Sequence, residues 1–426
     1  MIPFEGIPVG LAIPLWVGLA VIVAMLLWTA MLFVRGQRAR LHAPNAAPGA
    51  ADRFTWVFLV PALNEEVTIR DSVQRLLTVE GARRRIVVID DGSDDGTPAA
   101  LAEIDDPDLV VLRREPPAAR RGKAAALNHA YALLDGDLLA GADRAETIVV
   151  VVDADGRLHP DAPRYAAAHF ADPRVGGVQS LVRIYNRGGL LTWLQNVEFG
   201  VYGSLFQEGR NGWGTAGMGG NGQFNRLSAL DAVATADGPW RDRLTEDQDL
   251  GLRLAAAGWE GRQELRGVVD QQGLSAPRPL FRQRTRWSQG NLQAISLSGE
   301  IWRAPFPLAA RLELLLYLLM PLWQALVGLA LAVSLILWAT GEATFWAGGP
   351  TWWLAVVYLL AFGGTVLGCI AGRAADGPGG WLLGFLIGHP YAIYTWFLWP
   401  VLLRSSLRQL TERRDWAKTE REPLAA

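Results

Sequence analysis

The sequence predicts an α/β protein in which a domain with a mainly parallel sheet is joined to α-helical transmembrane segments and interfacial helices. Three observations support this class. Apolar residues are concentrated in the first 35 positions and again after about position 305. The region between them has the polarity of a soluble domain, and its β-rich and helical stretches alternate. Acidic motifs follow two of the β-rich stretches, at the end of a parallel sheet where ligands bind.

The first apolar run predicts a transmembrane helix. Residues 7–34 contain no charge, and about 20 apolar residues are enough to cross a bilayer. Arg35, Arg38 and Arg40 follow directly, whereas a secretory signal would carry its charges before the apolar region. Because basic residues favour the cytoplasmic side, we expect the N-terminus outside and the following domain in the cytoplasm.

The C-terminal region predicts further crossings at 312–339, 352–370 and 381–403. Three crossings would leave the tail outside, yet the tail carries a basic bias that belongs inside. Either one run is interfacial or re-entrant, or Pro321 divides residues 305–339 into two short passes; an even number of C-terminal crossings is favoured. The basic residues of this tail are Arg404, Arg408, Arg413, Arg414, Lys418 and Arg421.

The central segment predicts alternating strands and helices. Strands are expected at 55–60, 85–89, 109–112 and 147–152, and helices at 65–77, 97–104 and 122–134. Strands 85–89 and 147–152 are continuous apolar runs, as expected for strands covered on both faces. The expected division is a transmembrane helix at 1–35, a linker at 36–53, a cytoplasmic domain at 54–277, an interfacial helix at 278–304, a transmembrane bundle at 305–404 and a basic cytoplasmic tail at 405–426.

Charge and cysteine content restrict the classes of function. A formal net charge of −2 provides no basic field of the kind that nucleic-acid-binding proteins use, so no nucleic-acid partner is expected. The single cysteine, Cys369, lies in an apolar stretch and excludes an internal disulfide framework. Redox chemistry is therefore not indicated.

Carboxylates follow two of the predicted strands. Asp153 and Asp155 are separated by one residue, so they can share a hard cation that also binds phosphate oxygens. Asp90 and Asp91 end a neighbouring strand and are suited to hydrogen-bonding the base and ribose of a nucleotide. For both pairs the alternative is a plain turn, in which Asp bonds its own backbone.

Thr245, Glu246 and Asp247 precede a predicted helix over 249–257. The simplest interpretation is a helix start, with Thr245 as the N-cap and acids in the first turn. The functional interpretation adds a general base for the attack of a sugar hydroxyl. Asp247 is the first candidate for this base and Glu246 the second.

Two further segments are candidates for ligand binding. Residues 214–225 hold five glycines, including Gly219 and Gly220 beside Asn221, and predict an acceptor-side wall or a flexible loop. Gln283, Arg286 and Trp287 would share one helix face. That face could bind a diphosphate and stack on a sugar, or it could belong to an interfacial helix whose Arg and Trp meet lipid headgroups.

Taken in order, these motifs resemble the membrane-integrated family 2 glycosyltransferases, such as cellulose, hyaluronan, chitin and poly-N-acetylglucosamine synthases. The resemblance also includes Pro61 to Glu66 and Gly122 to Asn128. It implies a GT-A fold, a UDP-sugar donor, Mg²⁺ or Mn²⁺ as cofactor, and inversion to a β-linkage. The implied donor-binding residues are Pro61, Glu65, Asp90, Asp91, Lys123, Asp153, Asp155, Gln283 and Arg286; the metal ligands are Asp155 and Asp153, the acceptor-binding residues Gly219, Gly220, Asn221 and Trp287, and the catalytic carboxylates Asp247 and Glu246.

The resemblance also implies a specific role for each of several residues. Asp91 would touch the nucleoside, Asp155 the metal and diphosphate, Asp247 the acceptor hydroxyl, Arg286 the diphosphate, and Trp287 would flank the acceptor. Leu63 departs from the family, since many members carry an aromatic residue beside the uracil. Residues 218–224 also depart from the loops of the cellulose and hyaluronan enzymes and are similar to those of transferases that glucosylate diacylglycerol.

The resulting functional prediction is a multi-pass plasma-membrane enzyme that adds sugars from a UDP-sugar to a growing β-linked polysaccharide. A single addition to diacylglycerol or another lipid acceptor is the alternative. A transporter or a non-catalytic membrane scaffold with a degenerate nucleotide-binding domain is the third hypothesis. A homo-oligomer or an export partner would be compatible with the polysaccharide synthase.

Overall fold

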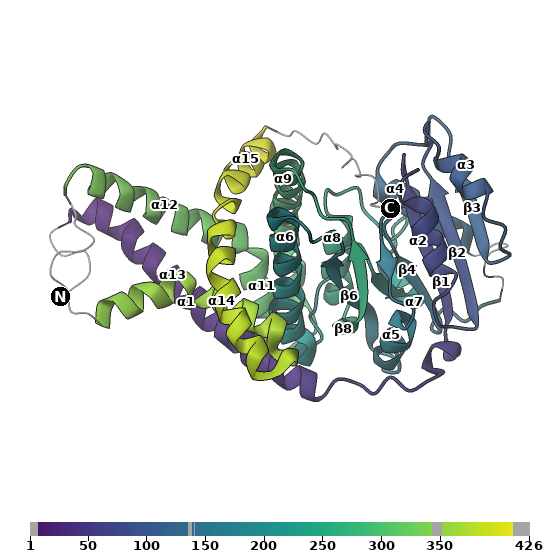
Figure 1. The fold of residues 1–426 in the computed structure, drawn as a ribbon, viewed down its shortest axis with the longest axis horizontal. Coiled ribbons are helices and arrows are strands. Elements are labelled where there is room, and N and C mark those ends of the chain that lie inside the picture. The colour runs from purple at the N-terminus through teal and green to yellow at the C-terminus, as the bar shows by residue number, and fades with distance from the viewer. Residues whose placement is uncertain (1–6, 135–138, 140, 343–351, 412–426) are drawn as a thin grey trace.

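The structure is a computed structural model that describes residues 7–134, 139, 141–342 and 352–411. Helices α1 (Val9–Leu41), α12 (Met320–Ala339) and α13 (Trp352–Arg373) extend from one end of the molecule, and an α/β domain forms the other end (Figure 1). The predicted α/β class with apolar helices is therefore confirmed. The predicted basic tail from Arg413 onward lies outside the described residues.

One eight-stranded mixed sheet organises the domain, in the order β3-β2-β1-β4-β7-β6-β8-β5. Among the described residues, four of its seven strand pairings are parallel, including β1 with both β2 and β4. The carboxyl ends of β1, β2 and β4 therefore meet at one edge. The strands are β1 (Thr55–Ala62), β2 (Arg83–Asp90), β3 (Leu109–Arg113), β4 (Thr147–Val151), β5 (Arg157–Leu158), β6 (Val175–Ile184), β7 (Gln223–Arg226) and β8 (Glu260–Gln271).

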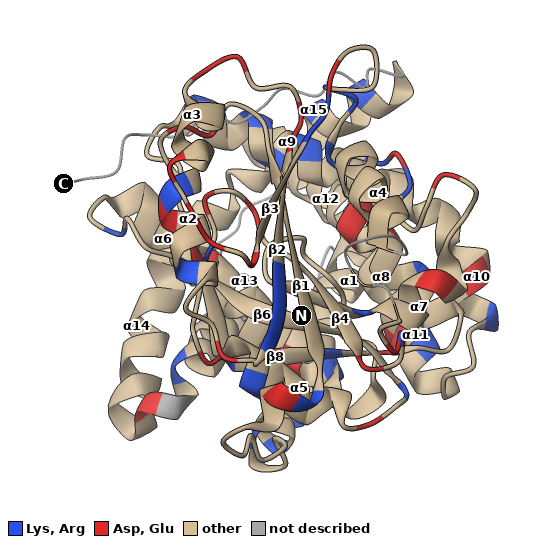
Figure 2. Cartoon of the chain, turned by 90° about the vertical axis from the view of Figure 1, so that its right-hand side faces the viewer, with Lys and Arg blue, Asp and Glu red and all other residues tan. Residues whose placement is uncertain are grey.

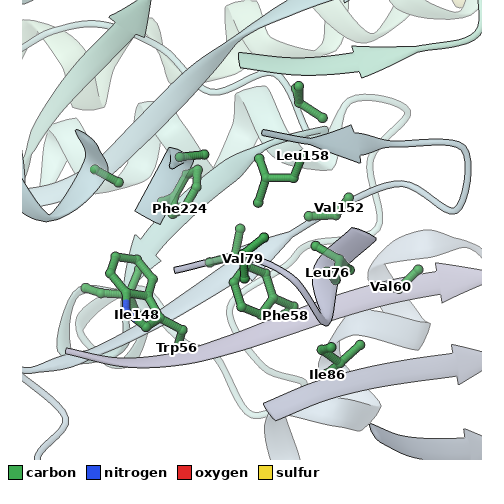
Figure 3. Close-up of a cluster of buried hydrophobic side chains, with 14 of the residues drawn as sticks. Trp56, Phe58, Val60, Leu76, Val79, Ile86, Ile148, Val152, Leu158 and Phe224 are labelled. Atoms are coloured by element: carbon green, nitrogen blue, oxygen red, sulfur yellow. The ribbon is translucent and has the colours of Figure 1, made fainter. Parts of the chain in front are cut away.

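Apolar side chains bury both faces of the central strands. Along β1, Trp56, Phe58 and Val60 point to one face, while Val57 and Leu59 point to the other, as the period of two requires. Figure 3 shows Trp56, Phe58 and Val60 packed with side chains from β2, β4 and β7. Because both faces are covered, the continuous apolar runs recognised in the sequence become central strands.

Helices cover both faces of the sheet, as the strand and helix alternation predicted. The helices of the domain are α2 (Ile69–Leu76), α3 (Thr97–Ala102), α4 (Lys123–Leu133), α5 (Ala162–Phe170), α6 (Leu190–Val201), α7 (Leu227–Val233), α8 (Glu246–Ala256), α9 (Pro277–Ala294) and α10 (Ser298–Arg303). Short helical turns lie at η1 (Ala50–Arg53), η3 (Tyr202–Gln207), η4 (Glu208–Trp213) and η5 (Ile295–Leu297). Acidic and basic residues are dispersed over the end of the domain that faces away from the apolar helices (Figure 2).

The helix predicted at 65–77 begins later than expected, at Ile69. The backbone amides of Glu65 and Glu66 instead bind Thr97 Oγ1 at 2.7 Å and Asp95 Oδ2 at 3.2 Å. These contacts with the loop after β2 hold the first residues in a turn. The same contacts keep Glu65 at the end of β1 rather than on a helix.

Three of the described helices are long and apolar enough to cross a membrane, judged by length and composition: Val9–Leu41, Met320–Ala339 and Ala355–Arg373. The expected single run over 312–339 is interrupted at Leu319, between α11 (Leu308–Leu318) and α12. Leu314 and Leu318 of α11 pack on Leu252 and Ala255 of the domain. Helix α11 therefore packs on the domain, and α12 carries the long apolar stretch.

The predicted run 381–403 is also divided. It forms α14 (Gly377–Thr395) and α15 (Leu398–Leu410), which follow one another across the direction of α1, α12 and α13 (Figure 1). Ser405 of α15 shares a 2.7 Å hydrogen bond with Ser288 of α9, and Tyr394 of α14 contacts α6. This last apolar run therefore packs along the domain.

A buried ion pair helps to join the apolar helix α1 to the domain. Arg210 and Glu313 are both buried, with Arg210 Nη2 2.9 Å from Glu313 Oε1. Trp28 of α1 donates its indole N–H to the same carboxylate at 3.1 Å, and the Arg210 guanidinium lies over the Tyr317 ring at 4.0 Å. Three segments that are distant in sequence therefore depend on one carboxylate.

Replacing Glu313 by Ala should destabilise the chain, because it leaves the Arg210 guanidinium buried without its carboxylate. Removal of one member of such a pair typically costs about 3–5 kcal/mol. We expect a lower temperature of thermal inactivation for the detergent-solubilised protein. The control is Glu300→Ala, which removes an exposed glutamate from α10. Equal inactivation temperatures for the two variants would contradict this account of the joint.

Candidate active site

A cavity of about 970 Å³ opens where β1, β2 and β4 end. It collects predicted site residues from distant parts of the chain: Pro61, Glu65, Asp91, Lys123, Asp153, Gly219, Gly220, Asn221, Glu246, Asp247, Gln283, Arg286 and Trp287 all line it. Asp90 and Asp155 are not among the lining residues. The far side of the cavity reaches two of the long apolar helices, with Trp28 of α1 and Met320 of α12 among its lining residues.

Lys123 is held between two carboxylates of the cavity. It begins α4, and its Nζ lies 2.6 Å from Asp153 Oδ1 and 3.7 Å from Glu246 Oε1. Burial by itself lowers the pKa of Lys123, but the charges of Asp153 and Glu246 outweigh burial and raise it above the ordinary lysine value. Lys123 is therefore a fixed positive charge beside the carboxylate that follows β4.

The two carboxylates after β4 occupy different environments. Asp153 is partly exposed to the cavity. Asp155 is only 3% exposed, and its Oδ2 accepts the backbone N–H of Gln272 at 3.1 Å. The turn predicted here does form, since Gly156 N–H donates to the Asp153 carbonyl. Of the pair, Asp153 is the residue whose carboxylate meets the cavity in this structure.

Glu246 and Asp247 lie in the first turn of α8 and face the cavity. Burial raises the pKa of Glu246 to about 7, although the charge of Lys123 and, more weakly, that of Arg286 oppose the shift. Burial likewise raises the pKa of Asp247, against the opposing charge of Lys123. Both groups are thus stronger bases than exposed carboxylates, which suits proton abstraction near neutral pH.

The predicted helix start does form, with Glu246, Asp247 and Asp249 as the acids in its first turn. Thr245 occupies the N-cap position, but its hydroxyl makes no capping bond to the backbone. It donates instead to Gln248 Oε1 at 3.3 Å. The start of α8 is therefore held by other contacts, among them the 2.8 Å bond from Gln248 N–H to Asp247 Oδ1.

The glycine-rich segment approaches the catalytic carboxylates closely. Gly220 has a φ of +79°, and a Cβ at this position would lie 2.7 Å from Asp247 Oδ2 and 3.4 Å from Lys123 Nζ. Only glycine fits both the conformation and the space. Beside it, Asn221 Oδ1 accepts the backbone N–H of Asp153 at 3.1 Å. The loop is therefore tied to the strand-end carboxylate rather than being independent of it.

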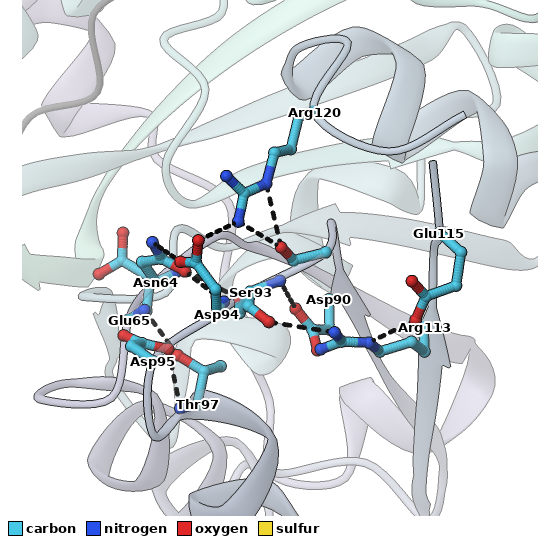
Figure 4. A network of polar contacts seen from close by, with 11 residues as sticks. Asn64, Glu65, Asp90, Ser93, Asp94, Asp95, Thr97, Arg113, Glu115 and Arg120 are labelled. Carbon is cyan, nitrogen blue, oxygen red and sulfur yellow. Dashed lines mark hydrogen bonds and ion pairs between the residues drawn. The ribbon is translucent and has the colours of Figure 1, made fainter. Parts of the chain in front are cut away.

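Two arginines at the end of β3 pair with the acidic residues at the end of β2. Arg113 pairs with Asp90 and Arg114 pairs with Asp91. Figure 4 shows Asp90 enclosed by Arg113 and by the backbone N–H of Ser93, which donates to it at 2.9 Å. Asp90 is therefore committed to supporting the loop, while Asp91 alone lines the cavity. The two arginines were not recognised from the sequence.

Helix α9 places Gln283, Arg286 and Trp287 on the cavity wall, as their helical spacing predicted. A neighbouring residue that sequence reasoning missed supports this wall. Arg284 is buried, contacts Glu198 of α6 at 3.0 and 2.6 Å, and lies 4.2 Å from the Trp287 ring centre. Tyr394 of α14 donates to the same Glu198 carboxylate at 2.9 Å. The sequence showed Arg284 only as one more arginine in a basic stretch, and its burial became visible in the structure.

The donor set fits a divalent cation that is shared with a substrate diphosphate. In the described part of the chain, no group of three or more His, Cys, Asp or Glu side chains could hold a metal ion without other ligands. Mg²⁺ in nucleotide enzymes characteristically binds one or two carboxylates together with substrate phosphates and water. Asp153, with Asp155 directly behind it, supplies oxygen ligands of this kind.

Among solved structures, the fold is similar to a mannosyltransferase from Pyrobaculum calidifontis, solved in complex with GDP-Man and Mn²⁺. The TM-score is 0.62 at 20% identity, and the match covers 94% of this chain and 100% of that one. At this identity the likeness shows a fold of the GT-A type.

Two family profiles match the chain. The profile for glycosyl transferase family group 2 covers residues 148–366, and that for glycosyl transferase family 2 covers residues 57–232. Beta-monoglucosyldiacylglycerol synthase of Synechocystis sp. is 30% identical over 419 residues, which is 92% of this chain and 82% of that protein. The chain belongs to glycosyltransferase family 2.

A second kind of relative matches a smaller part of the chain. Poly-beta-1,6-N-acetyl-D-glucosamine synthase of Staphylococcus aureus is 26% identical over 245 residues, covering 56% of this chain and 55% of that protein. The two relatives differ in acceptor, since one is named for a glycolipid product and the other for a polysaccharide. The enzyme class is common to both.

Proposed function

We propose that this enzyme transfers a single sugar from a UDP-sugar to the hydroxyl group of a membrane lipid such as diacylglycerol. The observation that carries the proposal is the extent of the cavity, which runs from Asp247 to membrane-helix residues such as Trp28 and Met320. The extended similarity to beta-monoglucosyldiacylglycerol synthase supports the same acceptor class. Addition to a lipid thus replaces polysaccharide extension as the favoured function.

In the proposed reaction, the acceptor hydroxyl oxygen attacks the anomeric carbon of the donor sugar as its bond to the diphosphate oxygen breaks. Asp247 takes the hydroxyl proton, and UDP leaves with the bonding electron pair. Attack from the face opposite the diphosphate inverts the anomeric carbon and gives a β-linked product. The raised pKa of Asp247 makes this carboxylate a suitable base.

The leaving diphosphate would lie between Asp153 and Arg286. The guanidinium of Arg286 would stabilise the charge that develops on it, and Gln283 on the same face of α9 would hydrogen-bond a phosphate oxygen. A Mg²⁺ or Mn²⁺ ion held through Asp153, with Asp155 behind it, would neutralise the same oxygens. Asp91, Pro61 and Glu65 at the ends of β1 and β2 would hold the nucleoside.

The proposed membrane arrangement removes the conflict in topology. If α1, α12 and α13 cross and α14 with α15 lies along the cytoplasmic interface, two C-terminal crossings return the chain to the cytoplasm. Exposed apolar side chains on α14 and α15, such as Leu382, Trp396 and Leu403, support an interfacial position. The domain, Arg35 and Arg404 are then all on the cytoplasmic side of the plasma membrane, as the distribution of basic residues favours.

The experiment is a donor panel on the purified full-length chain in nanodiscs that contain 1,2-dioleoylglycerol. UDP-sugars labelled with ¹⁴C should place label in the organic phase as a product with one added sugar, and EDTA should abolish the transfer. Label in ethanol-insoluble, glycosidase-sensitive material would instead favour the polysaccharide synthase. That second function is supported by the match to the Staphylococcus aureus enzyme. Turnover of no UDP-sugar would contradict the proposed donor.

The pH profile of the reaction should show an acid limb above the ordinary carboxylate range. Burial raises the pKa of Glu246 to about 7 and also raises that of Asp247. A base with a raised pKa is unprotonated only above that pKa, so kcat/KM should rise with pH at values above the ordinary carboxylate range and then level off. Lys123 lowers both pKa values, so Lys123→Met should move the limb to higher pH.

The matched variant for this profile is Lys123→Arg, which keeps the positive charge and should leave the limb in place. Each profile is normalised to its own plateau, so that a general loss of activity does not affect the comparison. A limb between pH 4 and 5 in the unmodified enzyme would show that the catalytic base has the pKa of an ordinary exposed carboxylate. In that case, burial does not raise the pKa of the catalytic base.

A further inference from the structure

The cavity has a polar half and an apolar half. The polar half contains Asp153, Asp247 and Arg286, which the proposed reaction uses. The apolar half takes no part in binding a nucleotide or a sugar. Six of its lining residues are Trp28, Phe206, Met320, Pro321, Val401 and Leu402.

Three of these apolar residues come from helices that are candidates for crossing a membrane. Trp28 belongs to α1, and Met320 and Pro321 begin α12; both helices are apolar enough to cross a bilayer. Val401 and Leu402 belong to α15, which packs beside α9 and so beside the catalytic helix face. The apolar half therefore lies where the chains of a bilayer lipid meet the domain.

The segment η3 connects the two halves. Its Tyr202 and Phe206, four residues apart, both line the cavity. The Tyr202 hydroxyl is 3.0 Å from that of Tyr317, and both tyrosines line the cavity together with Asp247. Phe206 lies one turn further along, against Trp28 with ring centres 5.2 Å apart. A molecule that touches both ends of η3 would contact the catalytic carboxylate with one part and apolar rings with the other.

Helix α12 adds one polar group to the apolar half. Of its three lining residues, Met320, Pro321 and Gln324, the last carries an amide. Polar side chains within membrane helices commonly mark a substrate path. A carboxamide at this depth suits the ester and glycerol region of a lipid, between the hydroxyl and the acyl chains.

We propose that the apolar half is an acyl-chain subsite of the acceptor lipid, bounded by α1, η3, α12 and α15. A lipid from the cytoplasmic leaflet enters with its hydroxyl directed to Asp247, its ester region beside Gln324 and one acyl chain against Leu402 and Met320. This inference rests on the proposed lipid acceptor and adds where that acceptor binds. The proposal implies that the enzyme selects acceptors by acyl-chain length at a part of the cavity that does not bind the donor.

Adjacent leucines on α15 provide a matched test. Leu402 is 8% exposed and lines the cavity, whereas Leu403 is 65% exposed and points away from it. Leu402→Trp should fill the subsite and lower transfer to 1,2-dioleoylglycerol by at least about tenfold, while transfer to 1,2-dihexanoylglycerol stays within about threefold of the unmodified enzyme. Leu403→Trp should change neither rate.

If Leu402→Trp and Leu403→Trp transfer sugar to the long-chain lipid at the same rate, and also to the short-chain lipid at the same rate, the subsite is overturned. The proposed glycosylation of a lipid is not affected by that result. Failure of the unmodified enzyme to label either lipid would instead contradict the proposed function. A folding defect in Leu402→Trp is bypassed by crosslinking the unmodified enzyme to a diacylglycerol with a diazirine near the end of one acyl chain. Crosslinks on α15 or α12 that excess dioleoylglycerol competes away support the subsite, and their absence overturns it.

Discussion

Replacing Asp247 by Asn should lower kcat by about 10²–10⁴-fold, the range that a positioned general base contributes. The amide keeps the size of the side chain but cannot accept the proton of the acceptor hydroxyl. Because the donor is held elsewhere in the cavity, its apparent KM should change much less than kcat. The measurement is transfer to lipid at saturating acceptor, together with equilibrium binding of UDP.

Glu246→Gln is the matched control, since Glu246 precedes Asp247 in the first turn of α8 and lines the same cavity. We expect a smaller loss for this variant, because the amide removes a neighbouring charge and leaves the base. If Glu246→Gln is the more damaged enzyme, then Glu246 is the base. Absence of UDP-sugar turnover in the unmodified chain, with Asp247→Asn no different, would revive the non-catalytic scaffold.

Replacing Arg286 by Met should lower kcat by about 10²–10³-fold, the typical effect of removing one group that stabilises developing charge. In the proposed reaction, the guanidinium meets the diphosphate as its bond to the sugar breaks. Arg286→Lys should recover part of the rate, because an ammonium keeps the charge but not the two-pronged geometry. The measurement is kcat with UDP release followed independently.

Arg282 supplies the control on the same helix. It lies one turn before Arg286 on α9 but is exposed and does not line the cavity. Arg282→Met should therefore keep kcat within about twofold. Equal losses at the two positions would indicate that α9 acts through its total positive charge at the lipid surface, as in the interfacial-helix interpretation, and not through a contact with the diphosphate.

The strand ends and the α9 face could be predicted because their patterns are local. A continuous apolar run such as 85–89 identifies a buried strand, and the residue that follows it must lie at the edge of the sheet. The spacing of Gln283, Arg286 and Trp287 likewise fixes one helix face. Parallel pairing of β1, β2 and β4 then brings Asp91 and Asp153 to the same cavity without further information.

Partners distant in sequence could not be predicted. The Arg284 to Glu198 pair spans 86 residues, and the contact of Tyr394 with Glu198 spans 196. No local periodicity encodes such contacts, which depend on how α6, α9 and α14 pack. The sequence also could not show which of Asp153 and Asp155 faces the cavity. That depends on how the turn after β4 orients each side chain.

Helix interruptions were harder to predict than helix content. Residues 312–339 form one apolar run in the sequence, yet the helix ends at Leu318 and restarts at Met320. Pro321, which the sequence offered as a point of division, lies in the first turn of α12, but the burial of Leu314 and Leu318 against α8 could not be predicted. Hydropathy does not distinguish an apolar face that meets protein from one that meets lipid.

The central claim is that Asp153, Asp247 and Arg286 act together in one cavity at the membrane surface. Its most direct test is an experimental structure of the full chain in a nanodisc with UDP and Mn²⁺. The account predicts the diphosphate between Asp153 and Arg286, with Mn²⁺ on the Asp153 side and the Asp247 carboxylate facing the β-phosphate. A nucleotide bound away from these three side chains, or three side chains on separate surfaces, would contradict it.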